Sequence, residues 1–197
     1  MKFKGIHHAW STPIEYDRFN IAGLSEHILT YYDMNNPPSD LGNYNIFDND
    51  CKPINDLKRC AYDNFRNHIK YMYHVDIDTY VTTMKGWVTG HGNNYSMSIH
   101  NHSGAQFSAV YYAMAEEDNR GGALVLHDPR SNANRGFDDR FQPHFKQIKI
   151  QPKTNDYVIF PSHVYHHVDP FYSQFRIAIP IDLYLFEDWL WKRLLLT

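Results

Sequence analysis

The spacing of apolar residues along this chain changes near residue 78. Before that point apolar positions recur at steps of three and four, which is the pattern of helices with one buried face. A short helix is predicted over residues 25–32, and a longer one begins near Pro53. The predicted buried face of the longer helix is made of Ile54, Leu57, Ala61, Phe65, Ile69 and Met72.

Beyond residue 78, short runs rich in Val, Ile, Tyr and Phe alternate with turn signals, which is typical of strands. Eight strands are predicted, at residues 79–88, 95–101, 107–114, 123–128, 145–152, 156–161, 163–170 and 174–181. Strands at this spacing indicate an antiparallel sandwich or barrel. The polar segment 131–144 is predicted to be a loop over one end of it.

These patterns predict a mainly β protein in three parts. A helical and irregular extension, residues 1–77, packs on a β core of residues 78–182, and helical spacing returns in residues 183–197. The apolar letters WLWKRLLL in this predicted C-terminal helix make a homodimer contact an expectation.

Composition narrows the class of protein. The 16% of aromatic residues, including 15 Tyr, suits a β-rich chain. A net charge of -3 disfavours nucleic acid as a partner. No run approaches the roughly 18 apolar residues of a membrane span, and the first residues lack the apolar core of a signal peptide. We therefore expect a cytoplasmic protein without a membrane partner, in which Cys51 and Cys60 are reduced thiols.

The candidate chemistry begins with two histidines, His100 and His102. Residues two apart on a strand project from the same face, so their imidazoles would lie together. One further ligand would complete a metal site with open positions, and His163, His166 and His167 border a later strand. The letters HNH do not indicate an HNH nuclease, whose residues are spread over a ββα hairpin.

The chain resembles cupins in spacing more than in chemistry. Cupins carry an H-x-H pair and, further on, a glycine, a proline, a second glycine and a histidine. Asn155 and His163 stand here in the places of the two glycines, while Pro161 and His166 keep the expected positions.

A closer resemblance, from Trp87 to Ile181, is to the small 2-oxoglutarate/Fe(II)-dependent oxygenases of bacteria and phages. The shared motifs, in order, are HNH at 100–102, SAVYY at 108–112, DPR at 128–130, FPS at 160–162, HHVDP at 166–170 and the arginine at 176. Each motif alone is a weak signal, and six in order make a specific one.

This resemblance implies a double-stranded β-helix, or jelly roll, and a non-haem iron dioxygenase. Such an enzyme uses Fe(II), converts the small co-substrate 2-oxoglutarate to succinate and CO2, and hydroxylates a substrate that the sequence does not specify. The iron ligands would be His100, His102 and His166. Arg176, ten residues after His166, would bind the far carboxylate of 2-oxoglutarate.

Further expectations concern Arg176 and the residues around it. The always-charged guanidinium of Arg176 suits bidentate binding of a carboxylate. If Arg176 opens a strand, the small residues Ala178 and Pro180 share its face, while Ile177, Ile179 and Ile181 form an opposite apolar face. The resemblance also implies that Tyr112 supports the far carboxylate and that Arg130 contacts substrate near the mouth.

The sequence departs from most of this superfamily, which binds iron through H-x-D and a distant histidine. His102 stands where that carboxylate is expected. Three alternatives follow: a three-histidine site, which we favour; a site in which Asp128 supplies the carboxylate and one of His100 and His102 does not bind; or a site that binds zinc or no metal. The corresponding alternative functions are a cupin-like three-histidine metal enzyme without 2-oxoglutarate and a non-catalytic binding barrel.

Overall fold

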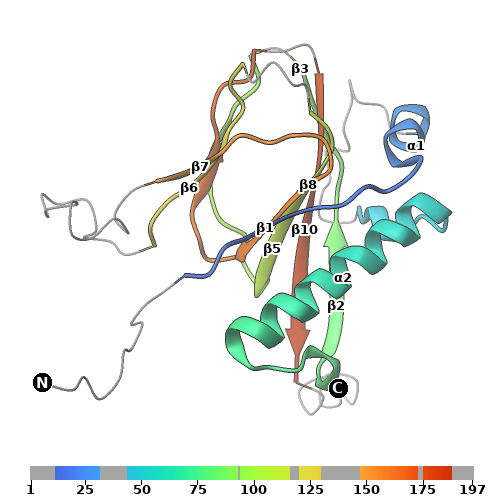
Figure 1. Ribbon diagram of the computed structural model, residues 1–197, viewed down its shortest axis with the longest axis vertical. Helices are drawn as coiled ribbons and strands as arrows, with labels where there is room; N and C mark the ends of the chain where they lie inside the picture. Colours follow the sequence, from blue (N-terminus) through green and yellow to red (C-terminus); the bar gives the residue numbers. More distant parts are fainter. Residues whose placement is uncertain are drawn as a thin grey trace, which may run out of the picture.

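The computed structural model describes residues 12–31, 44–92, 94–115, 120–129, 147–172 and 175–187. In this part of the chain, ten strands form two antiparallel sheets, and two α-helices lie beside the larger sheet (Figure 1). The predicted mainly β jelly roll is therefore confirmed, with two more strands than the alternation of apolar residues predicts.

The larger sheet has six strands. Its order is β1 (Glu15–Arg18), β8 (Asp156–Pro161), β5 (Phe107–Met114), β10 (Phe175–Phe186) and β2 (Val81–Gly86). The sixth strand, β3 (Thr89–Gly92), pairs with the first residues of β10, while β2 pairs with its last residues. The long strand β10 thus pairs with β5 on one side and with both β2 and β3 on the other.

The smaller sheet has the order β4 (Met97–His100), β9 (His166–Val168), β6 (Leu124–Leu126) and β7 (Ile148–Ile150). His100 lies directly opposite His166 in the β4–β9 pair. Apolar side chains from both sheets meet in one buried cluster, formed by Val110, Tyr112, Leu124, Leu126, Val158, Phe160, Val164 and Ala178. The register of this small sheet therefore sets the position of two predicted metal ligands.

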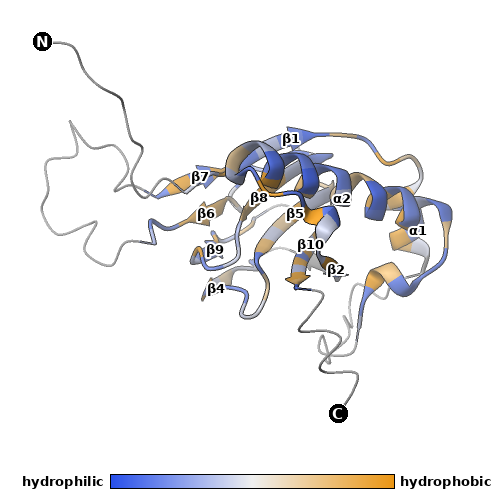
Figure 2. Ribbon diagram, turned by 90° about the horizontal axis from the view of Figure 1, so that it is seen from below, coloured by the Kyte–Doolittle hydropathy of each residue, from blue (hydrophilic) through white to orange (hydrophobic). Residues whose placement is uncertain are grey.

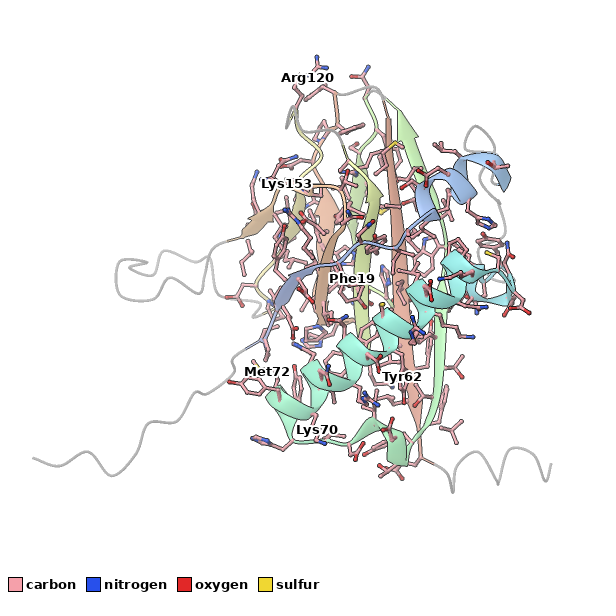
Figure 3. All side chains as sticks on the ribbon, turned by 45° about the vertical axis from the view of Figure 1, so that its right-hand side comes forward. Phe19, Tyr62, Lys70, Met72, Arg120 and Lys153 are labelled. Carbon is pink, nitrogen blue, oxygen red and sulfur yellow. The ribbon has the colours of Figure 1, made fainter. Side chains whose placement is uncertain are left out.

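Helices α1 (Leu24–Tyr31) and α2 (Lys52–Tyr73) cover the outer face of the larger sheet, and the 3₁₀ turns η1 (Ile46–Asp48) and η2 (Ile77–Thr79) flank α2. Figure 2 shows the largely hydrophilic side of α2 turned away from the sheet. The predicted face of α2 is buried at Ile54, Leu57, Ala61, Phe65 and Ile69. The prediction that Met72, labelled in Figure 3, is a core residue is wrong: it is 42% exposed in the last turn of α2, beyond the buried Ile69.

Strand β10 has the two faces that the alternation predicts. Ile177, Ile179 and Ile181 are fully buried in the core cluster beneath the helices. Ala178 and Pro180 face the space between the sheets, together with Arg176, where they line a cavity. The alternation of residues alone predicts both faces correctly here, because each face of this strand is covered by another part of the protein.

Two of the predicted parts of the chain differ from the structure. Residues 183–186 are not helical but continue β10, because Leu183 and Leu185 alternate toward the core and pair with Met84 and Thr82 of β2. The rest of the predicted C-terminal helix, residues 188–197, lies outside the described residues. The segment 1–77 is not only an extension, since its strand β1 pairs with β8 in the larger sheet. No helix in the described ranges is long and apolar enough to cross a bilayer.

Candidate metal centre

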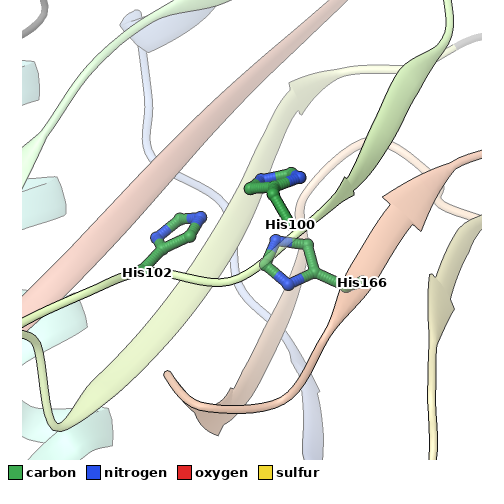
Figure 4. A group of neighbouring side chains, drawn as sticks. All are labelled: His100, His102 and His166. Atoms are coloured by element: carbon green, nitrogen blue, oxygen red, sulfur yellow. The ribbon is translucent and has the colours of Figure 1, made fainter.

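Three histidines converge at the end of the smaller sheet (Figure 4). His100 is the last residue of β4, His102 follows it in the turn beyond the strand, and His166 opens β9. The backbone N–H of His102 donates to the carbonyl of Ser162 at 3.1 Å, which fixes this turn beside the end of β8. One nitrogen from each ring lies within 4.8 Å of the other two, as a shared metal ion requires.

The hydrogen bonds of these rings determine which nitrogens are free. Nδ1 of His100 lies 2.8 Å from the carbonyl oxygen of Ser98, and Nδ1 of His166 lies 3.0 Å from that of Val164. A carbonyl oxygen only accepts, so in each neutral ring Nδ1 carries the hydrogen. The unprotonated Nε2 atoms are left as donors to a metal, the arrangement that metal-binding histidines generally show.

His102 has a different partner. Its Nδ1 lies 2.6 Å from Oδ1 of Asp182, a carboxylate that is 5% exposed. The same oxygen accepts a hydrogen bond from the hydroxyl of Ser108 at 2.6 Å, and Ser108 in turn contacts Ser162 at 2.8 Å. His102 is therefore also held with Nδ1–H toward an acceptor and Nε2 free.

Burial prepares His166 to bind a cation in its neutral form. The side chain is only 4% exposed, and its ring packs edge-on against Phe160 with ring centres 4.9 Å apart. Desolvation in this setting lowers the pKa of His166 to about 4. The ring is neutral near pH 7, so a metal does not have to displace a proton from it.

The three histidines share a cavity of about 420 Å³ with Arg176. Arg176 is 2% exposed, and its Nη1 donates to the carbonyl oxygen of Gly122 at 2.5 Å. Its Nε is buried without a hydrogen-bond partner, and no acidic side chain within the described part of the chain forms an ion pair with it. Desolvation lowers the pKa of this guanidinium, which still remains charged at neutral pH.

Aromatic rings surround the guanidinium. Its central carbon lies 5.0 Å from the ring centre of Phe171 and 5.8 Å from that of Tyr112. Tyr112 lines the cavity together with Val110 of the same strand. Burial raises the pKa of Tyr112 to about 12, so its hydroxyl keeps its proton and can donate a hydrogen bond.

The other candidate site residues lie outside the histidine group or outside the described residues. Asp128, which follows β6, belongs neither to the histidine group nor to the lining of the cavity. Arg130 lies outside the described residues. His163 is exposed on the turn before β9, and the ring of His167 contacts His127 at 2.8 Å and Asp169 at 3.1 Å instead of the metal group.

Two residues in contact with His102 were missed from the sequence. Trp87 packs its ring against His102 with ring centres 5.5 Å apart, and Asp182 accepts the His102 hydrogen bond. Asp182 continues the face of Arg176, Ala178 and Pro180 along β10, so the alternation already contained a signal for it. No such signal marks Trp87, which lies after the end of β2.

Residues 85–182, about half of the chain, match the model of the family described as "Putative 2OG-Fe(II) oxygenase". The chain belongs to this oxygenase family. The matched range runs from β2 to Asp182 and contains all three histidines as well as Tyr112 and Arg176. No curated protein is significantly similar to the sequence of this oxygenase.

Solved structures of oxygenases share its fold. A viral collagen prolyl hydroxylase from Paramecium bursaria Chlorella virus 1, in a 2-oxoglutarate complex, gives a TM-score of 0.56 at 14% identity over 86% of this chain and 94% of that one. HygX from Streptomyces hygroscopicus, with nickel and 2-oxoglutarate bound, gives 0.52 at 9% identity over 87% and 81%. A Trichoplax adhaerens prolyl hydroxylase, in complex with a hypoxia inducible factor peptide, gives 0.50 at 21% identity over 75% and 61%.

These likenesses establish the jelly-roll fold of the family member described here. The chain spans less than two thirds of the Trichoplax structure, and 49% and 43% of two further oxygenase structures that it matches. At identities this low, the substrates of those enzymes do not transfer with the fold.

Proposed function

We propose that this oxygenase is a non-haem Fe(II)/2-oxoglutarate-dependent hydroxylase in which His100, His102 and His166 hold the iron. The donor set fits this ion: three imidazoles converge with Nε2 free, and imidazole nitrogen is a common ligand of iron. Three ligands on one side of an ion leave positions open for a chelating co-substrate and for oxygen. Asp128 is not needed in this ligand set.

The observation that carries the 2-oxoglutarate assignment is Arg176. A buried cation is costly unless a counter-charge lies beside it, and no acidic partner of Arg176 is found among the described residues. The cation lies in the same cavity as the three histidines. A dicarboxylate that chelates the metal with one end and meets Arg176 with the other satisfies both groups at once.

When bound, Fe(II) with 2-oxoglutarate and O₂ supplies oxidising chemistry that yields succinate and CO₂ and places one oxygen atom in a substrate C–H bond. The protein's own residues position the reactants. Arg176 neutralises and orients the far carboxylate, and the protonated hydroxyl of Tyr112 is available as a second donor. The rings of Tyr112 and Phe171 keep water from the guanidinium.

Two alternative functions give Arg176 no such role. A three-histidine metal enzyme without 2-oxoglutarate would use the same metal group, and a binding barrel would need neither feature. Both would leave a buried guanidinium facing a cavity without an anionic ligand. Substrate recognition is a separate question, and a contact from Arg130 stays a prediction.

Anaerobic addition of Fe(II) and 2-oxoglutarate tests the proposal, because the chelate has a visible charge-transfer band. We expect the band with the wild-type protein and at least about tenfold weaker 2-oxoglutarate binding in Arg176→Ala, since hydrogen bonds to a charged group contribute about 1.5–3 kcal/mol. Arg59→Ala, on the exposed side of α2, is the matched control and should titrate like wild type. Metal binding without the band would favour the cupin-like enzyme, and no metal binding the barrel without catalysis.

A further inference from the structure

The most unusual feature of the metal group is the carboxylate behind it. Most of the superfamily places a carboxylate in contact with iron at the position of His102, and this chain places an imidazole ring there. Asp182 lies behind that ring, with Oδ1 2.6 Å from Nδ1 of His102. The carboxylate that is missing at the ligand position is thus present behind the ligand, one side chain further from the metal site.

Asp182 is poorly explained as a purely structural residue. Its side chain is 6% exposed, and a buried carboxylate is costly unless it is paired and hydrogen-bonded. Its Oδ1 contacts the ring of His102 and the hydroxyl of Ser108, and the hydroxyl of Tyr184 is a further hydrogen-bond partner of this carboxylate. These partners are an imidazole and two hydroxyls, with neither Lys nor Arg among them. The nearby Arg176, which lines the same cavity, donates instead to Gly122.

A divalent ion bound to Nε2 of His102 would change this balance. The ion makes the Nδ1–H of the ring more acidic, so the hydrogen bond to the carboxylate becomes stronger and more charge-assisted. In return, the carboxylate raises the electron-donating strength of the ring toward the metal. The hydrogen bond between His102 and Asp182 is therefore strongest when the metal group is filled.

We propose that Asp182 is a positioning residue that supplies, through His102, the negative charge that other members of the superfamily supply by direct ligation. This rests on the proposed metal site, but not on 2-oxoglutarate. The hydrogen bonds fix the ring of His102 in one tautomer and orientation, and the carboxylate offsets the charge of the ion. Ser108, which is itself in contact with Ser162, donates a hydrogen bond that holds the carboxylate in place.

The first test measures metal affinity without 2-oxoglutarate, by competition for Co(II) or Ni(II) with a chromophoric chelator. Asp182→Asn keeps the size of the side chain and an acceptor oxygen for His102, but removes the charge. We expect its metal affinity to fall about 10–100-fold, the usual cost of losing such an outer partner. Ser108→Ala, which removes one hydrogen bond to Asp182 and leaves its charge, is the matched control and should lose much less.

Thermal unfolding separates this role from a structural one. Without metal, Asp182→Asn should melt at the same temperature as wild type or higher, because it removes a buried charge. With saturating Ni(II), its melting temperature should rise less than that of wild type. A variant that is equally destabilised with and without metal would show that Asp182 only maintains the fold, and the proposal would be overturned.

The second test places a carboxylate at the ligand position itself. His102→Asp restores a ligating carboxylate but places it beside Asp182, so the two like charges should oppose one another. In the double variant His102→Asp/Asp182→Asn, only one carboxylate remains. We expect the Asp182→Asn change, which weakens metal binding in the wild-type background, to strengthen it in the His102→Asp background.

An Asp182→Asn effect of the same sign and size in both backgrounds would overturn the proposal, since it would show that the two positions act independently. A wild-type protein that binds neither metal would overturn both this inference and the proposed function. Metal binding that responds to Asp182 as expected, but without the 2-oxoglutarate band, would leave this inference standing while the proposed function fails.

Discussion

The side chain of Arg176 donates to the carbonyl oxygen of Gly122, and a Cβ atom at position 122 would lie 2.7 Å from the same guanidinium nitrogen. The added atom would also lie 2.8 Å from the ring of Phe171. Gly122 has φ of 72°, a left-handed conformation that side chains rarely adopt. The position of the cation in the cavity therefore depends on a glycine more than fifty residues earlier in the chain.

Gly122→Ala should displace the guanidinium and weaken 2-oxoglutarate binding by about tenfold, since about 1.4 kcal/mol corresponds to that factor. Calorimetric titration of 2-oxoglutarate into the Ni(II)-loaded protein measures the change. Gly23→Ala is the matched control, because Gly23 has a similar φ of 75° but an added Cβ would meet only Pro53, at 3.9 Å. Both variants should lose stability, and only Gly122→Ala should lose affinity; unchanged affinity in Gly122→Ala would contradict the placement of the co-substrate.

Asn155, which stands where the cupin pattern has a glycine, has a left-handed backbone conformation. Its φ is 73°, and its backbone N–H donates to the carbonyl of Tyr112 at 2.7 Å in the turn that leads into β8. Asparagine tolerates this conformation better than most residues. Its side-chain oxygen also accepts a hydrogen bond from the hydroxyl of Tyr111 at 2.9 Å, which a glycine could not do.

Two substitutions at Asn155 separate these effects. Asn155→Gly keeps the backbone conformation and loses the Tyr111 hydrogen bond, so we expect a loss of about 1 kcal/mol in the free energy of unfolding. Asn155→Ala adds backbone strain, and the loss should reach about 2 kcal/mol. Urea unfolding measures both. Equal losses in the two variants would mean that the left-handed backbone contributes nothing to the difference.

Strand β10 shows how much of the structure a periodic sequence pattern can predict. Ile177 and Ile179 on one side and Ala178 on the other could be assigned from alternation alone, because each face of this strand meets a different buried layer. Asp182 belongs to the same pattern, but its meaning depends on His102, which is 80 residues earlier in the chain. Only the folded register brings the two together.

The strand segments that the sequence did not predict lack such a periodic pattern of apolar residues. Strand β1 reads Glu-Tyr-Asp-Arg and is mostly exposed at the edge of the sheet, so it has no apolar alternation to detect. The letters LYLF at 183–186 are compatible with a helix or a strand, and pairing with β2 decides for the strand. In both cases a distant partner, not local preference, determines the structure.

The low pKa of His166 predicts acid sensitivity of the metal-free protein. The folded state binds this proton near pH 4, whereas an unfolded histidine binds it near pH 6.5. Between these values the unfolded state holds more protons, so stability is fully present above about pH 6.5 and falls as the pH falls toward 4. At pH 5 this single group should cost about 2 kcal/mol.

Urea unfolding in the presence of a chelator measures this effect in wild type and His166→Gln. The variant lacks the titrating ring, so its stability should decline less between pH 7 and pH 5, by about 2 kcal/mol. NMR titration of the His166 ring should give a midpoint near pH 4. Parallel stability curves for the two proteins would show that the ring is protonated equally in the folded and unfolded states.

Metal binding should stabilise the fold through His100. At an ion concentration 100 times the dissociation constant, binding adds about 2.7 kcal/mol, which raises the melting temperature of a chain this long by about 5–10 °C. His100→Ala should abolish most of that rise but little of the metal-free stability, since the ring is partly exposed. His163→Ala, at an exposed histidine on the neighbouring turn, should keep the full rise, which a chelator should reverse. An undiminished rise in His100→Ala would show that the ion binds elsewhere, because this histidine and His166 face each other across the β4–β9 pair.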